Sequence, residues 1–112
     1  MSEQSWTIFY PPEVFEGSTL KQKDLYTAVV DLKKWLSWQG EVVPMPMTIA
    51  GRLCMEIRVA PRVVPEYGLY QSVLEFIKQL EAFMKGRFDL DMNSEKRRIH
   101  HLDENEMQYV GS

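Results

Sequence analysis

Residues 42–59 read VVPMPMTIAGRLCMEIRV, and this stretch decides the fold because it describes a β-hairpin between two helical segments. Every second residue on each arm is apolar, which is the period of two expected for a half-buried strand. Ala50 and Gly51 lie between the arms and predict the turn. On the return arm the alternating apolar residues are Leu53, Met55, Ile57 and Val59. The stretch therefore predicts two adjacent antiparallel strands.

The first arm of this hairpin carries Pro44 and Pro46. Proline has no backbone N–H to donate to a neighbouring strand, so it is found mainly in edge strands. Because the two prolines are spaced by two, both missing N–H groups belong to the same side of the strand. We expect residues 42–49 to form a strand at an edge of the sheet.

The segment before the hairpin has the pattern of an amphipathic helix. Thr19 and Gln22 have the spacing of a capping box, which predicts a helix that starts there and runs to Trp38, with Gly40 past its end. The predicted buried stripe consists of Leu25, Ala28, Val29, Leu32, Trp35 and Leu36. We expect this helix to pack one face, Trp35 included, into the core.

A second helix is predicted after the hairpin. Pro65 fits its first turn, where a missing N–H has no helical partner to lose. Its apolar stripe runs to Gly86 and consists of Leu69, Val73, Phe76, Ile77, Leu80, Phe83 and Met84. This spacing predicts a helix with one buried face.

Two outer strands complete the pattern. Residues 5–10 are rich in aromatic and β-branched side chains and are stopped by two prolines. Residues 87–93 alternate apolar and charged side chains, which predicts the fourth strand. The resulting order βαββαβ predicts an α+β two-layer sandwich of ferredoxin-like type, with an antiparallel sheet of order 4-1-3-2 and both helices on one face. That order places the second strand at an edge, in agreement with its prolines.

The length of 112 residues fits one domain. We expect residues 1–93 to form this single α+β domain. From residue 94 onward the periodicity is lost, so residues 94–112 are predicted to form a mobile C-terminal tail.

Composition excludes several classes of protein. The formal net charge is −3, which opposes non-specific attraction to nucleic-acid phosphates. Apolar runs are only a few residues long, so no membrane segment is expected. The single cysteine cannot form an internal disulfide, and we therefore expect a cytoplasmic protein.

No metal site or cofactor is expected from the motifs. Asp89, Asp91 and Asn93 have the spacing of the first calcium-loop ligands, but Ser94 stands where glycine is required and His100 where a bidentate glutamate is required. His100 and His101 are adjacent, so on an extended segment they point to opposite sides. No nucleotide-binding loop is present in the sequence.

Cys54 is the one candidate for reactive chemistry. The strand period places it on the side opposite the apolar residues, beside Arg52, Glu56 and Arg58. Two neighbouring guanidinium groups would lower the pKa of the thiol and favour the thiolate. The alternative is that these arginines pair with Glu56, or with Asp89 and Asp91 on a neighbouring strand.

The main functional hypothesis is a small non-enzymatic protein-interaction or regulatory module. Trp38, Met45 and Met47 follow one another closely around a proline-bearing edge, and we expect them to form an exposed methionine-aromatic surface. The expected partner is another protein or a second copy of the chain, bound through an edge strand or through the open sheet face.

Two alternatives stay open. One is a small-ligand-binding protein or cofactor-independent enzyme with an apolar pocket lined by residues such as Trp6, Tyr10 and Trp38. The other is a nucleic-acid-binding domain, since RNA-recognition domains share this element order and Phe9 could stack on a base. The third strand lacks the aromatic residues that such domains display, so nucleic acid is the less favoured partner.

Overall fold

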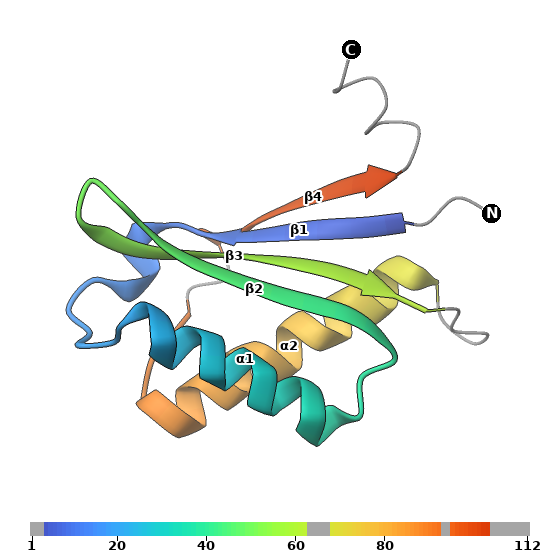
Figure 1. The fold of residues 1–112 in the computed structure, drawn as a ribbon, viewed down its shortest axis with the longest axis horizontal. Helices are drawn as coiled ribbons and strands as arrows, with labels where there is room; N and C mark the ends of the chain where they lie inside the picture. Colours follow the sequence, from blue (N-terminus) through green and yellow to red (C-terminus); the bar gives the residue numbers. More distant parts are fainter. Residues whose placement is uncertain (1–3, 63–67, 93–94, 104–112) are drawn as a thin grey trace, which may run out of the picture.

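A computed structural model describes residues 4–62, 68–92 and 95–103. The elements along the chain are β1 (Gln4–Tyr10), the 3-10 helix η1 (Pro12–Phe15), α1 (Gln22–Leu36), β2 (Gly40–Ile49), β3 (Arg52–Pro61), α2 (Leu69–Phe88) and β4 (Arg98–Asp103). The strands form one antiparallel sheet of order β2-β3-β1-β4, and both helices lie against the same face of it (Figure 1). The protein is thus a small α+β domain with a four-stranded sheet and two helices.

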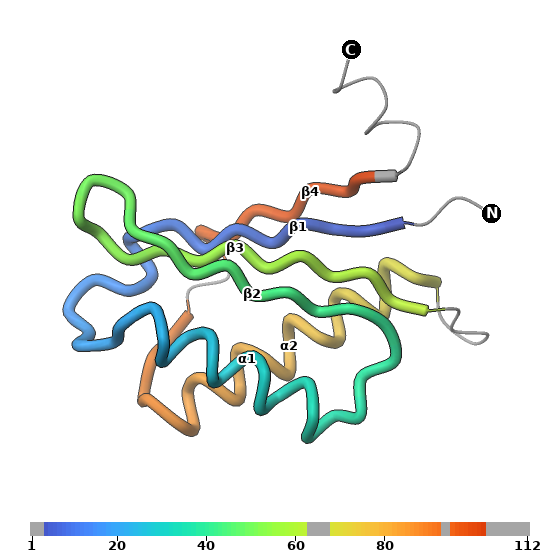
Figure 2. Tube along the Cα trace, in the orientation of Figure 1, coloured from blue at the N-terminus to red at the C-terminus, as the bar shows by residue number. Residues whose placement is uncertain are grey.

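The hairpin of β2 and β3 is present as predicted. The two strands pair from Gly40 opposite Pro61 to Ile49 opposite Arg52. Ala50 and Gly51 both have positive φ angles, 52° and 75°, which gives the turn the twist that suits antiparallel strands. β2 lies at an edge of the sheet, as its two prolines predict (Figure 2).

The core lies between the sheet and the helices. The predicted residues Met55, Ile57 and Val59 of β3 are fully buried in it. The other elements contribute Ile8, Tyr10, Leu25, Val29, Leu32, Val73, Ile77, Leu80 and Met84, all almost completely buried. Burial of this apolar surface on one side of the sheet is the main force that holds the two layers together.

Helix α1 differs from the prediction at both ends. Its N-cap is Lys21 rather than Thr19, and the backbone N–H of Lys21 donates to Oδ2 of Asp24 over 2.8 Å. Ser37, with a φ of 52°, ends the helix. Trp35 was predicted in the core but is 71% exposed, because it lies at the margin of the helical arc that faces the sheet. Its ring lies beside that of Phe83, 6.4 Å away.

The prediction of a fourth strand at residues 87–93 is wrong. Helix α2 continues to Phe88, and Asp89, with a φ of 53°, ends it. The chain then continues without regular structure, and Leu90 and Met92 are buried in the core. A loop that inserts every second side chain under the sheet produces the same alternating pattern as a half-buried strand.

The fourth strand is β4, which lies in the segment predicted to be a tail. β4 pairs antiparallel with β1, from Gln4 opposite Asp103 to Phe9 opposite Arg98. The sheet therefore extends beyond the expected domain boundary at residue 93. Residues 104–112 of the predicted tail, and Pro65, lie outside the described residues. Neither described helix is long and apolar enough to cross a lipid bilayer.

Candidate interaction surfaces

No helix or strand among the described residues covers the face of the sheet opposite the helices, which we call the open face (Figure 1). On β2 this face carries Val43, Met45, Met47 and Ile49, and three of these side chains are well exposed: Val43 at 43%, Met45 at 37% and Ile49 at 50%. Strand alternation places Phe9, Arg98 and His100 on the same face. The open face thus combines an apolar edge column with charged and aromatic side chains.

Pairing between the strands brings most of the predicted site residues together on this face. Glu56 lies opposite Met45 on one side and opposite Phe9 on the other. Cys54 lies opposite Met47, Arg58 opposite Val43, and Arg52 opposite Ile49. Of the predicted site residues, Trp38 alone is not on the open face.

Trp38 lies in the connection between α1 and β2 and packs against the core instead. Its ring is tilted by 58° against that of Phe76, with 5.2 Å between the centroids. Met45 and Met47 lie on the other face of the sheet, so the predicted methionine-aromatic surface around Trp38 is not formed. The reason is that the core extends past the end of α1 and takes up this indole, whereas Trp35 stays exposed.

The thiol of Cys54 is buried and not activated. Its side chain is fully inaccessible although it lies on the open face. Burial raises the pKa of the Cys54 thiol, and the negative charge of Glu56 raises it further. This shift is opposite to the one predicted from the neighbouring arginines, so the thiol is a poor nucleophile near neutral pH.

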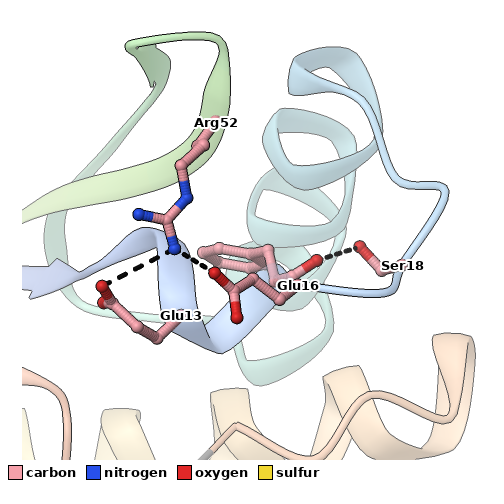
Figure 3. A network of polar contacts seen from close by, with 5 residues as sticks. Glu13, Glu16, Ser18 and Arg52 are labelled. Atoms are coloured by element: carbon pink, nitrogen blue, oxygen red, sulfur yellow. Dashed lines mark hydrogen bonds and ion pairs between the residues drawn. The ribbon is translucent and has the colours of Figure 1, made fainter.

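Arg52 is engaged with two carboxylates at the end of the hairpin. Its guanidinium group is paired with Glu16, and its Nη2 is 3.7 Å from Oε1 of Glu13, as Figure 3 shows. In the same network the hydroxyl of Ser18 donates to the carbonyl of Phe15 over 2.8 Å. These exposed ion pairs join the β2–β3 turn to η1 and contribute little free energy individually.

A second polar network lies under the start of β4. The hydroxyl of Tyr10 donates to Oε2 of Glu81 over 3.1 Å, and Nη1 of Arg97 donates to the same oxygen over 2.7 Å. Burial raises the pKa of Tyr10, and the charge of Glu81 raises it further. Tyr10 therefore stays protonated as a hydrogen-bond donor. We call this three-residue network the Glu81 clamp, because it joins β1, α2 and the chain just before β4.

Two of the pockets among the described residues lie at the start of α2. The first, of about 580 Å³, is lined by Trp6, Tyr70, His101 and neighbouring residues. Its Trp6 and His101 rings are stacked 4.5 Å apart at an angle of 16°. The second, of about 490 Å³, is lined by Trp38, Gln71, Ser72 and Glu75.

The three aromatic residues predicted to line one apolar pocket lie in different places. Trp6 lines the first pocket, Trp38 lines the second, and Tyr10 lies in the core. The indole N–H of Trp38 is buried and has no hydrogen-bond partner among the described residues. A buried donor without a partner costs free energy, so an acceptor that reached this N–H would stabilise it.

Within the described residues, no group of three or more His, Cys, Asp or Glu side chains could hold a metal ion. Asp89 forms an ion pair with Lys85, with 2.9 Å between Oδ1 and Nζ. This pair lowers the pKa of Asp89 and raises that of Lys85. Asp89 is thus paired with a lysine of α2, whereas Arg52 of β3 is paired with Glu13 and Glu16.

No family model matches the chain, and no curated protein sequence matches it. Two solved structures show a distant likeness. One is a phage SAM lyase in complex with S-methyl-5'-thioadenosine, with 13% identity, a TM-score of 0.49, and coverage of 90% of this chain and 81% of that one. The other is PelD 158-CT from Pseudomonas aeruginosa PAO1, with 14% identity and a TM-score of 0.43. That match covers 99% of this chain, which spans about a third (35%) of the PelD chain.

Proposed function

We propose that the protein is a small non-enzymatic interaction module that binds a second copy of itself through a part of its sheet that the helices leave uncovered. We assign its domain to the ferredoxin-like class. The observation that carries the proposal is the one-sided sheet, whose open face exposes Val43, Met45 and Ile49. Apolar side chains gathered on an uncovered sheet face are typical of contact surfaces.

The use of the polar residues supports binding over catalysis. Arg52 is paired with Glu13 of η1 and with Glu16 just after it, and Glu81 is shared between Tyr10 and Arg97. The raised pKa of Cys54 disfavours its thiolate. These groups stabilise the fold in ways that leave none of them poised as a nucleophile or a base. A cytoplasmic location is part of the proposal and rests on the single reduced cysteine.

The test is the mass of the purified protein in solution, measured by light scattering over a range of concentrations with a reducing agent present. The expected result is a mass of twice the chain's 13.2 kDa, with dissociation on dilution. The reductant excludes a dimer held by oxidised Cys54. A mass of one chain at every concentration would overturn the proposal of self-association.

A second candidate, small-ligand binding, is favoured by the unpartnered indole N–H of Trp38 beside its pocket. The indole N–H signal of Trp38 can be identified in a nitrogen-proton correlation spectrum as the one lost in Trp38→Phe. If the pocket binds ligands, small amides and carboxylates added to the protein should shift that signal in a saturable way. A signal that stays in place with all of them excludes this candidate. Nucleic-acid binding has less support, because the carboxylate-bearing Glu56 lies directly opposite Phe9.

A further inference from the structure

The pocket that Trp38 forms with the start of α2, which we call the Trp38 pocket, is built on residues with fixed positions. Glu75 lies three residues after Ser72 and four after Gln71, and these spacings place side chains next to each other on a helix. The backbone N–H of Trp38 donates to the carbonyl of Lys33 over 3.2 Å, which holds Trp38 at the end of α1. The fold itself therefore brings these four lining residues together.

The indole of Trp38 gives the pocket an apolar wall. The ring packs against Phe76 with 5.2 Å between the centroids, and the residue is half-buried. The indole nitrogen is buried, so the accessible atoms of the ring are carbon atoms. Such a ring binds alkyl groups by contact and cations through the negative potential of its face.

Glu75 brings a negative charge to the same pocket. Its Oε1 accepts a hydrogen bond from Nε2 of Gln79 over 3.1 Å. Among the described residues, no lysine or arginine forms an ion pair with Glu75, and none lines the pocket. By contrast, the carboxylates of Glu16, Asp31 and Glu81 are each paired with an arginine. The charge of Glu75 is thus available to a ligand.

A carboxylate and a tryptophan ring in one pocket have the chemistry that recognises an organic ammonium ion. The carboxylate attracts the positive charge directly, and the ring attracts it through its quadrupole. The hydroxyl of Ser72 and the amide oxygen of Gln71 can accept hydrogen bonds from the ammonium N–H groups. The volume of about 490 Å³ lies within the range of small-ligand sites.

We propose that the Trp38 pocket binds a small organic cation, whose ammonium group contacts the carboxylate of Glu75 and the indole of Trp38. This rests on the second candidate function, small-ligand binding, and names the class of the ligand. A neutral amide of the same shape binds more weakly than the cation. The corresponding carboxylate binds more weakly still, because Glu75 repels it.

The test compares two amides that differ only in an ammonium group, L-leucinamide and 4-methylpentanamide. Each is titrated into the protein at about pH 6, where the amine of leucinamide is protonated. The indole N–H signal of Trp38 in a nitrogen-proton correlation spectrum gives the two dissociation constants. We expect leucinamide to bind about tenfold more tightly, from one ion pair and one cation–π contact.

A Glu75→Gln variant tests the origin of this preference. The substitution removes the charge and keeps the size of an exposed side chain, so the variant should fold, which circular dichroism checks. We expect it to lose most of the preference for leucinamide. The matched control is Glu16→Gln, which removes an exposed carboxylate that does not line the pocket, and should keep the preference in full.

The possible failures are distinguishable. Equal affinity for the two amides, or an unchanged preference in Glu75→Gln, overturns the assignment of an organic cation while small-ligand binding stands. Tighter binding of 4-methylpentanoate, the corresponding carboxylate, overturns the assignment in favour of an anion. A Trp38 signal that none of the three compounds shifts overturns both the ligand class and the second candidate function.

Discussion

The two edges of the sheet, β2 and β4, differ in nearly every respect. β2 has ten residues, carries two prolines and continues directly into β3 through a tight turn. β4 has six residues and carries no proline. It follows the long helix α2 in the chain and pairs with β1 in the sheet. A sequence therefore indicates an edge strand when it contains prolines, which prevent a further strand from pairing there. An unblocked edge with charged side chains has no such signature.

The edges are also held in place differently. β2 enters the sheet at Gly40, where the backbone approaches Ala60 and Pro61 so closely that a side chain has no room. β4 is attached by its ladder with β1 and by the Glu81 clamp. Steric fit therefore fixes one edge, and polar contacts fix the start of the other. Variants that act on one edge at a time test this difference.

The largest effect is expected for Gly40→Ala. Gly40 has a φ of 127°, and an added Cβ would lie 2.3 Å from the carbonyl oxygen of Ala60. We expect a loss of roughly 3 kcal/mol in the free energy of unfolding, measured with urea. Gly51→Ala is the control, since its φ is 75° with open space around it, and should cost about 1 kcal/mol. Equal costs at the two glycines would contradict a steric fixation of β2.

A smaller effect is expected for Arg97→Met, which removes one arm of the Glu81 clamp. The two side chains of this pair are each 21% exposed, and we expect a loss of about 2 kcal/mol, since the hydrogen bond involves charged groups. Amide hydrogen exchange should accelerate in β4 while β2 is unaffected. Uniform acceleration in both strands would mean that the clamp stabilises the whole domain rather than this edge.

The clamp also predicts a loss of stability in alkaline solution. The pKa of Tyr10 is raised above its ordinary value of 10.0. Below pH 10 the folded and unfolded chains both keep this proton. Above pH 10 the unfolded chain releases it and the folded chain does not, so stability falls by up to about 1.4 kcal/mol per pH unit. Urea unfolding between pH 9 and pH 11 should show a smaller slope in Tyr10→Phe, and an unchanged slope would exclude Tyr10 as its source.

The smallest effect is expected for Met45→Glu, on the open face of β2. Met45 is 37% exposed, so stability should change by less than about 0.5 kcal/mol. If the open face joins two copies, light scattering should give a mass closer to that of one chain than for the unaltered protein. A folded variant with an unchanged mass would exclude Met45 from the interface.

The first three strands and both helices were predictable because their apolar residues recur with a clear period. The prolines of β2 gave its edge position. β4 was not predictable, because its apolar residues Ile99 and Leu102 point to opposite faces and its other side chains resemble those of a solvated tail. The alternation at Phe88, Leu90 and Met92 belongs instead to a helix end and a loop packed under the sheet.

The candidate surface was predictable in part. The alternation of side chains along the strand placed Arg52, Cys54, Glu56 and Arg58 on one face. The pairing of β1 with β3 puts Phe9 on the same face, opposite Glu56. Local sequence did not indicate how far the core extends past the end of α1. The burial of Trp38, the exposure of Trp35 and the inaccessible thiol of Cys54 all depend on packing between distant segments.

Pro44 and Pro46 have a consequence for assembly size. The outer side of β2 lacks backbone donors at these two positions. Strand-by-strand growth into a fibre needs a free edge at every step. The same prolines that mark β2 as an edge strand therefore oppose open-ended growth by strand addition at this edge.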